Sequence, residues 1–253
     1  MTIDAPIGII AGTGFYSLAQ LEDAQEQTLE TAYGQAKATT GKWHGLDIVF
    51  QTRHGASHSV PPHLVNYHAN ISAFVELGVQ DVFAISAVGG IDETLQPGDL
   101  VCLDDFLDFT KNRNSTFCDG TGPRGVFHTD VTYPYNQRLR EELLTAAQNV
   151  GIEMRAHGVY CAFEGPRFET PAEVRMARIL GGDVAGMTGV PECPLAAEAG
   201  LNYAGISIVC NPGAGISAEP ISHEEVGEVL KASGHRVLQV LDEVLRVRAT
   251  AQR

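Results

Sequence analysis

Short apolar runs alternate along the chain with stretches in which apolar residues recur at helical spacing. Six runs carry little internal charge and are predicted to be buried strands, at residues 7–10, 48–52, 82–87, 100–103, 159–163 and 203–210. Five stretches are predicted to be helices, at residues 66–77, 137–150, 171–180, 191–199 and 223–247. Strands interspersed with helices are typical of an α/β fold.

The chain carries no internal repeat, low-complexity tract or Ser/Gly-rich linker. A length of 253 residues is sufficient for one domain with a substantial core. We therefore expect a single domain over residues 1–253. The least regular region, residues 110–134, is expected to be a long functional or interface loop.

The composition narrows the possible partners and the compartment. A net charge of -14 argues against a nucleic-acid duplex or an anionic membrane as main partner, because both require a basic surface. The five cysteines are odd in number and form no CxxC pair, which favours reduced thiols. The first residues lack a basic start and a long apolar run, so we expect a soluble cytoplasmic protein.

Two helix starts place residues of interest. In residues 170–173 (TPAE), an N-cap threonine is followed by a proline and a capping-box glutamate, so Phe168 and Glu169 lie in the turn before a helix. Residues 222–225 (SHEE) form a second capping box with His223 in the first turn. Structural capping alone is the other interpretation of both patterns.

Polar and glycine-rich segments at the ends of the predicted strands could bind an anion. Residues 12–14 (GTG) and 86–90 (SAVGG) offer converging backbone N–H groups. Arg53 and His54 add a fixed cation suited to forked binding of phosphate oxygens, and Thr188 adds a hydroxyl near a helix start. Each glycine turn alone is equally compatible with a tight strand-to-loop connection. Together the four segments predict an anion site.

Glu169 and Asn211 match the edge of a 6-oxopurine ring. A carboxylate accepts hydrogen bonds, and a carboxamide both donates and accepts, which suits N1–H as donor and O6 and N7 as acceptors. Adenine fits this edge poorly. The alternative for Glu169 is a helix-start carboxylate favoured by the helix dipole.

Five segments occur in the order in which one known family carries them: residues 8–14 (GIIAGTG), 53–55 (RHG), 65–70 (VNYHAN), 164–170 (EGPRFET) and 186–192 (GMTGVPE). Over nearly its whole length the chain resembles the trimeric purine nucleoside phosphorylase and methylthioadenosine phosphorylase family. The resemblance implies a mixed central sheet flanked by helices. It also implies a homotrimer whose sites lie near subunit interfaces.

The resemblance also implies roles for individual residues. The implied phosphate site consists of Thr13, Arg53, His54, Ser86, Ala87 and Thr188. The implied substrate contacts are Phe168 against the base, Met187 against the ribose, and Glu169, Asn211, Gly213, His223, His58 and His128. Of these, His128 is expected to reach across from a neighbouring subunit, and His58 to lie near the ribose or phosphate. The implied catalytic residues are Asn211, Glu169 and His54.

The reaction implied is phosphorolysis of an N-glycosidic bond, which yields a free purine and ribose 1-phosphate. Inorganic phosphate is the co-substrate, and neither a cofactor nor a covalent protein nucleophile is required. Asn211 would stabilise the departing purine at N7 and O6, while Glu169 holds N1–H.

The sequence leaves two 6-oxopurine substrates open. Relatives that use methylthioadenosine carry aspartate in place of Asn211 and a small hydroxyl residue in place of Glu169, which disfavours adenine nucleosides. Residues 211–218 (NPGAGISA) resemble the bacterial S-methyl-5'-thioinosine phosphorylase branch. Residues 223–226 (HEEV) are instead similar to inosine and guanosine phosphorylases, in which the matching histidine binds the 5'-hydroxyl.

A histidine-rich stretch raises the alternative of a zinc site. It contains His54, His58, His63 and His68, but nearby carboxylates and cysteines are absent, and prolines at 61 and 62 interrupt any shared helix face. We therefore predict no metal.

Two further classes of protein are disfavoured. A nucleoside hydrolase usually needs an aspartate-rich calcium site, which the sequence lacks. A non-catalytic nucleoside-binding protein could keep Phe168 and Glu169, but it would have no need for Arg53, His54 and Thr188.

Overall fold

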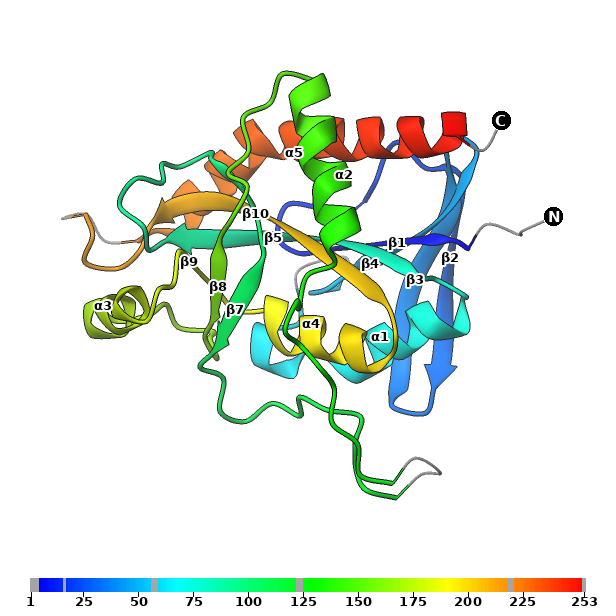
Figure 1. The fold of residues 1–253 in the computed structure, drawn as a ribbon, viewed down its shortest axis with the longest axis horizontal. Coiled ribbons are helices and arrows are strands. Elements are labelled where there is room, and N and C mark those ends of the chain that lie inside the picture. The colour runs from blue at the N-terminus through cyan, green and yellow to red at the C-terminus, as the bar shows by residue number, and fades with distance from the viewer. Residues whose placement is uncertain (1–4, 16, 56–58, 122–124, 218–220, 252–253) are drawn as a thin grey trace.

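The computed structural model describes residues 5–15, 17–55, 59–121, 125–217 and 221–251 (Figure 1). Its strands are β1 (Ile7–Ala11), β2 (Glu22–Thr31), β3 (Gly34–Trp43), β4 (Leu46–Thr52), β5 (Asp81–Gly90), β6 (Leu100–Cys102), β7 (Asp105–Asp108), β8 (Val159–Ala162), β9 (Val184–Gly186) and β10 (Asn202–Pro212). Its helices are the 3-10 turn η1 (Pro62–Leu64), α1 (Tyr67–Glu76), α2 (Gln137–Asn149), α3 (Pro171–Ile179), α4 (Gly189–Glu198) and α5 (His223–Ala251).

The strands form one mixed sheet in the order β2-β3-β4-β1-β5-β9-β8-β7, with β10 paired to both β5 and β6. The central pairs of β1 with β4, β1 with β5 and β5 with β10 are parallel, whereas β2, β3 and β4 form antiparallel neighbours. The predicted α/β class with a mixed central sheet is therefore confirmed.

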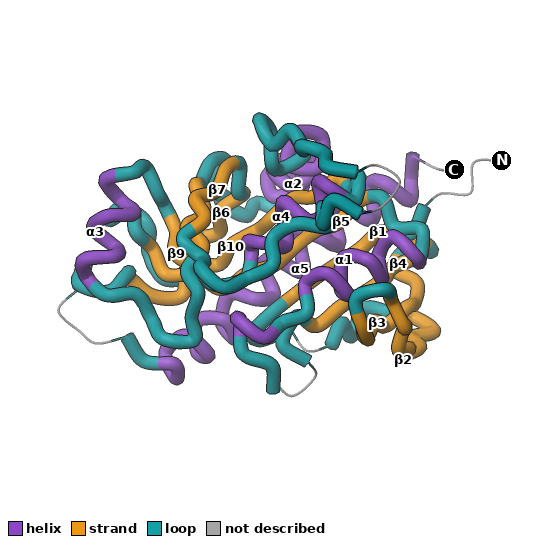
Figure 2. Tube along the Cα trace, turned by 90° about the horizontal axis from the view of Figure 1, so that it is seen from below, coloured by secondary structure: helices purple, strands orange, loops and turns teal. Residues whose placement is uncertain are grey.

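Alternating side chains of the central strands bury both faces of the sheet. On β5, Phe83 and Ile85 join a core that includes α2 and α5, whereas Val82 and Ala84 join a core that includes α1 and α4. The two helix pairs lie on opposite sides of the strands in Figure 1, and Figure 2 views the molecule from the side of α1 and α4. The sheet is thus covered on both faces, which explains why its central strands are apolar throughout.

A gap in the pairing of β5 positions the site. β1 pairs with β5 as far as Ala11 opposite Ile85, and the pairing of β5 with antiparallel β9 begins at Gly89 opposite Ala185. Between these two points, no described strand pairs with residues 86–88 on this side. The backbone there is available to a ligand, because the sheet divides where the strands end.

The helix boundaries lie within two residues of the predicted ranges, apart from the end of α5, which continues four residues further to Ala251. The capping box at the start of α3 is present, with the Thr170 side chain accepting from the Glu173 N–H and the Glu173 side chain accepting from the Thr170 N–H. The helix predicted after residue 222 begins at His223. The side chains of His223 and Glu225 lie outside the described part of the chain, and with them the second capping box.

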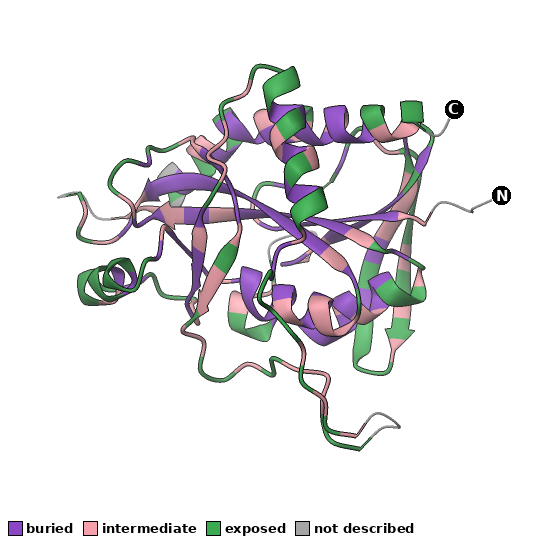
Figure 3. Cartoon of the chain, in the orientation of Figure 1, coloured by how far each residue is buried: buried purple, intermediate pink, exposed green. Residues whose placement is uncertain are grey.

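Four strands were not predicted from the sequence. β2 and β3 form an antiparallel hairpin whose residues are largely exposed (Figure 3), so they lack the apolar run of a buried strand. β7 and β9 have only four and three residues. These strands depend on pairing with their neighbours and leave little periodic signal in the sequence.

The predicted irregular loop is irregular in the structure. Within residues 110–121 and 125–134 the chain forms neither helix nor strand, and it extends beyond α4 in Figure 1. All five cysteines are free. No helix in the described part of the chain is both long and apolar enough to cross a membrane.

Candidate active site

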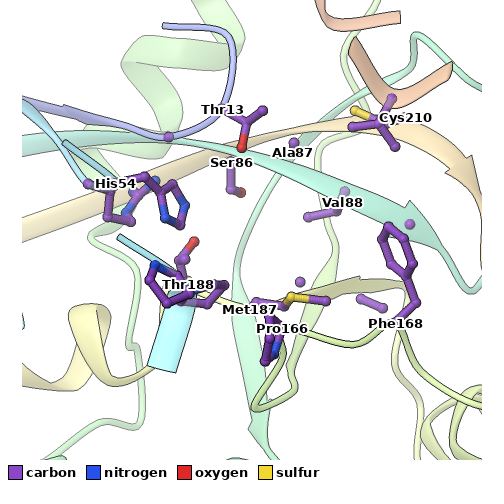
Figure 4. Close-up of a pocket in the computed structure, with 18 of the residues that line it drawn as sticks. Thr13, His54, Ser86, Ala87, Val88, Pro166, Phe168, Met187, Thr188 and Cys210 are labelled. Atoms are coloured by element: carbon purple, nitrogen blue, oxygen red, sulfur yellow. The ribbon is translucent and has the colours of Figure 1, made fainter. Parts of the chain in front are cut away.

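A pocket of about 420 Å³ opens at the carboxyl ends of β1, β4 and β5 (Figure 4). It brings together ten residues singled out in the sequence: Thr13, Arg53, His54, Ser86, Ala87, Phe168, Glu169, Met187, Thr188 and Asn211. These residues come from segments spread over most of the chain. Their roles remain predictions, but their convergence makes this pocket the candidate active site.

Two other predicted residues, Gly213 and His128, do not line the pocket. Gly213 packs against the sheet, where its N–H donates to the Gly90 carbonyl at 2.6 Å and a Cβ would lie 2.8 Å from that oxygen. His128 is exposed on the long loop. His58 and the side chain of His223 lie outside the described residues.

Arg53 is fixed by a buried ion pair with Glu192. Its Nε and Nη2 donate to the two carboxylate oxygens at 2.6 and 2.8 Å, and its Nη1 donates to the Ile85 carbonyl at 2.9 Å. Burial alone would lower the pKa of Arg53, but the charge and hydrogen bonds of Glu192 raise it above its ordinary value. Arg53 therefore stays charged.

This geometry differs from the forked phosphate contact expected from the sequence. The fork of Arg53 faces Glu192, and Nη2 also donates to the Ile10 carbonyl at 3.5 Å. Nη1, which donates once to the Ile85 carbonyl, is therefore the nitrogen that retains a second N–H for a ligand. Nη1 also lies beside Gly12, where a Cβ would approach it to 3.1 Å. A glycine at this position leaves the guanidinium room at the pocket wall.

Other residues at the same end are also bonded to the protein. The Nδ1 of His54 lies 2.8 Å from the Val60 carbonyl and donates to it, because a carbonyl oxygen can only accept. The hydroxyls of Ser86 and Ser207 lie 2.8 Å apart. The backbone N–H of Thr188 donates to the Tyr160 hydroxyl at 3.0 Å. This end of the pocket is therefore ordered by the fold itself.

Glu169 lies at the other end of the pocket, and its carboxylate is less completely hydrogen-bonded to the protein. It is buried, and its Oε1 has no hydrogen-bond partner among the described residues. Burial raises the pKa of this carboxyl above its ordinary value. Beside it, Phe168 is 39% exposed, a large fraction for an aromatic ring in a pocket wall. Both observations suit a surface that a flat, hydrogen-bonding ligand would cover.

Asn211 reaches the pocket through an irregularity in β10. The register with β5 shifts between Val209 and Asn211, and such a bulge redirects the side chains around it. Asn211 pairs with Gly89, where a Cβ would lie 3.4 Å from the amide nitrogen. The amide donates one hydrogen bond to the Pro212 carbonyl at 2.7 Å. A carboxamide keeps a second N–H and its oxygen beyond that bond.

The sequence did not reveal the residues that hydrogen-bond to Arg53 and Ser86 from outside the pocket, which are Glu192 and Ser207. Glu192 belongs to a recognised segment, but no local signal marks it as the partner of Arg53. Ser207 could have been found as the hydroxyl inside the apolar run 203–210. Val226 of α5 adds an apolar contact to the pocket.

Two histidines of the histidine-rich stretch, His54 and His68, face backbone carbonyls, whereas His63 is exposed. His68 Nε2 lies 2.8 Å from the Thr116 carbonyl, as His54 Nδ1 does from that of Val60. Within the described residues, no three His, Cys, Asp or Glu side chains are grouped closely enough to hold a metal ion.

Comparison with known proteins agrees with this fold and pocket. The family model described as "Phosphorylase superfamily" matches residues 6–246. The chain is 50% identical over 235 residues to a probable 6-oxopurine nucleoside phosphorylase of Moorella thermoacetica, covering 93% of this chain and 90% of that protein. It is 42% identical to a probable S-methyl-5'-thioinosine phosphorylase of Methanothermobacter thermautotrophicus, covering 97% and 85%.

Among solved structures, the methylthioadenosine phosphorylase of Schistosoma mansoni in complex with adenine superposes with a TM-score of 0.91 at 32% identity, covering 98% of this chain and 92% of that one. The fold and pocket thus define a nucleoside-phosphorylase type of α/β enzyme. The chain belongs to the phosphorylase superfamily. The resemblance seen in the sequence motifs is confirmed.

Proposed function

We propose that the protein cleaves the N-glycosidic bond of 6-oxopurine nucleosides, such as inosine and guanosine, with inorganic phosphate. The products are the free purine and ribose 1-phosphate. One observation carries this proposal: a single pocket joins an end ordered around Arg53 and His54 to an end where Glu169 is buried with an unpartnered oxygen. An oxyanion fits the first end, and the N1–H of a 6-oxopurine fits the second.

The proposed chemistry transfers the ribosyl group from nitrogen to oxygen. A phosphate oxygen bonds to C1' as the bond from C1' to N9 breaks, and the electron pair of that bond passes into the purine. Asn211 donates toward N7 or O6, where the charge develops, and Glu169 accepts from N1–H. A proton from solvent neutralises the released base. No cofactor takes part in this reaction.

The names of the relatives support a 6-oxopurine substrate. The relative of Moorella thermoacetica is named for 6-oxopurine nucleosides, and that of Methanothermobacter thermautotrophicus for S-methyl-5'-thioinosine, whose base is also a 6-oxopurine. Such an activity would serve purine salvage in the cytoplasm.

S-methyl-5'-thioinosine is the second candidate substrate, and Val226 is the observation that favours it. This apolar side chain lines the pocket three residues after His223, which is about one turn of α5. A histidine at the 5' end favours a hydroxyl, whereas a valine favours a methylthio group. His223→Met should therefore raise kcat/KM for methylthioinosine relative to inosine. An unchanged ratio would mean that His223 does not contact the 5' end.

We also propose a homotrimer in which the long loop brings His128 to a neighbouring pocket. The loop carries apolar side chains outward, with Tyr133 75% and Val126 73% exposed. Exposed side chains of this size are typical of a surface that another subunit covers. Light scattering in solution gives the mass, and a monomer or dimer mass would contradict the trimer.

Phosphate dependence is the deciding test of the function. Protein is incubated with inosine in phosphate-free buffer and in the same buffer with phosphate, and hypoxanthine is measured. We expect release only with phosphate. Equal release in both would contradict a phosphorylase, because the anion end would then not supply the nucleophile. A chelator in the same assay should leave the rate unchanged.

A further inference from the structure

The loop that extends beyond α4 has a buried anchor near its start. The side chain of Arg113 is only 2% exposed although the surrounding chain is irregular. It does not line the pocket. A buried guanidinium needs several acceptors, because burial removes the water that would otherwise bind it. The segments that supply these acceptors are the ones that Arg113 connects.

The first group of acceptors lies where the chain passes from β9 into the start of α4. Nη1 of Arg113 donates to the Met187 carbonyl at 2.6 Å and to the Val190 carbonyl at 2.8 Å. These two carbonyls flank Thr188. Arg113 therefore fixes from behind the turn that carries Met187 and Thr188 into the pocket.

The second group follows the end of β8. Nη2 of Arg113 donates to the Glu164 carbonyl at 2.7 Å and to the Phe163 carbonyl at 3.3 Å. In return, the Glu164 carboxylate accepts the N–H groups of Lys111 at 2.6 Å and Asn112 at 3.2 Å. Hydrogen bonds donated by the loop to both the backbone and the side chain of this segment thus join the loop to the chain that leads to Phe168 and Glu169.

A third contact reaches the segment that carries Pro62. Nη1 of Arg113 lies 3.1 Å from the Tyr67 hydroxyl, which donates to the Pro62 carbonyl at 2.9 Å. Pro62 lines the pocket. One side chain therefore joins three separate pieces of the pocket wall.

We propose that Arg113 is a positioning residue that keeps the base end of the pocket aligned with the ribose and phosphate end. The inference rests on the proposed function, since alignment matters where phosphate must approach C1' in line. Arg113 contacts neither substrate. It acts through the Met187 turn and the Glu164 segment, and it links both to the root of the loop that carries His128.

Arg113→Lys tests this role because lysine keeps the charge but has a single nitrogen, which cannot span carbonyls on both sides. The matched control is Arg140→Lys. Arg140 is also buried and also donates to two backbone carbonyls, those of Leu103 at 2.8 Å and Ala156 at 2.6 Å, but it lies outside the pocket lining. Thermal unfolding and steady-state kinetics with inosine and phosphate are measured for both variants.

We expect both variants to lose thermal stability, and only Arg113→Lys to lose about 100-fold in turnover, the scale expected when reacting groups are misaligned by about 1 Å. The loss should lie in kcat rather than in either KM, because each end still binds its own substrate. Turnover equal to that of Arg140→Lys, or a loss in KM alone, overturns the role. Absent turnover in the wild type contradicts the proposed function, and this role with it.

Tyr67→Phe is the second variant, and it decides the question if Arg113→Lys does not fold. It removes one hydroxyl between Arg113 and Pro62 and leaves the ring in place. We expect a smaller loss, again in kcat. If Arg113→Lys does not fold, an unchanged kcat in Tyr67→Phe overturns the proposal.

Discussion

The two ends of the pocket are built differently. At the proposed phosphate end, Arg53 and His54 already have protein partners in Glu192 and the Val60 carbonyl, and Ser86 is paired with Ser207. At the base end, Glu169 is buried with an oxygen that has no partner among the described residues. The protein itself holds the polar groups of the first end in place, whereas in the proposed function the base would supply the partner of Glu169 at the other end.

This difference teaches where specificity arises. Phosphate is small and always the same, so a site whose donors are held in place gains by avoiding reorganisation. The base varies between nucleosides, and a buried group that only the correct base can pair penalises the wrong one. We therefore expect changes at the phosphate end to affect stability and phosphate use, and changes at the base end to affect substrate choice.

The largest effect should come from breaking the ion pair of Arg53. Glu192→Ala leaves a buried charge without its partner, which should cost about 3–5 kcal/mol in the free energy of unfolding. Urea denaturation measures it. The double variant Arg53→Met, Glu192→Leu removes both charges and should recover much of the loss. A loss of about 0–1 kcal/mol, typical of a surface pair, would show that Glu192 does not compensate Arg53.

Glu169→Gln should lower kcat/KM for inosine by about 10- to 100-fold, since one buried hydrogen-bonding group is worth about 1–3 kcal/mol. The same change should raise thermal stability at neutral pH. Burial raises the pKa of Glu169 in the folded protein, so its contribution to stability is present in acid and is lost as pH rises through that raised pKa. The gain of the glutamine variant should therefore shrink in acid.

Glu173→Gln is the matched control for that pH dependence. Hydrogen bonding to Arg167 and to the Thr170 N–H lowers the pKa of Glu173 to about 2. Its contribution to stability is present above the unfolded pKa and is lost as pH falls toward about 2. The control should lose stability at neutral pH and match the wild type in strong acid. The same pH trend in both variants would refute the assignment for Glu169.

Asn211→Asp should shift the preference from inosine toward adenosine by about tenfold or more, which corresponds to about 1.4 kcal/mol. An ionised aspartate loses the donor to O6 and can accept from a 6-amino group. The ratio of kcat/KM values for the two nucleosides measures the shift. If the ratio stays constant, Asn211 does not read the base.

The smallest effect is expected at Ser207, which is hydrogen-bonded to Ser86 but does not line the pocket. Ser207→Ala should raise the KM for phosphate by about 2- to 10-fold, because one hydrogen bond contributes about 0.5–1.5 kcal/mol. The KM for inosine should not change. Ser233→Ala, at a buried serine of α5 outside the pocket lining, is the control and should alter neither value.

The sequence alone determined the α/β class, the positions of the helices and the buried strands, and the ten residues that meet in the pocket. Apolar periodicity and capping are local, so a window of the chain contains the information. The tertiary structure decided the exposed hairpin of β2 and β3, because its strands are defined by pairing and not by burial.

The tertiary structure also decided what each site residue can do. Arg53 faces Glu192, 139 residues further along the chain, and Ser86 faces Ser207, 121 residues further. No local pattern marks such pairs, because they depend on where the chain returns. The sequence therefore supplied the chemical groups of the site, while long-range packing set their partners, their charge state and the atoms that remain for a ligand.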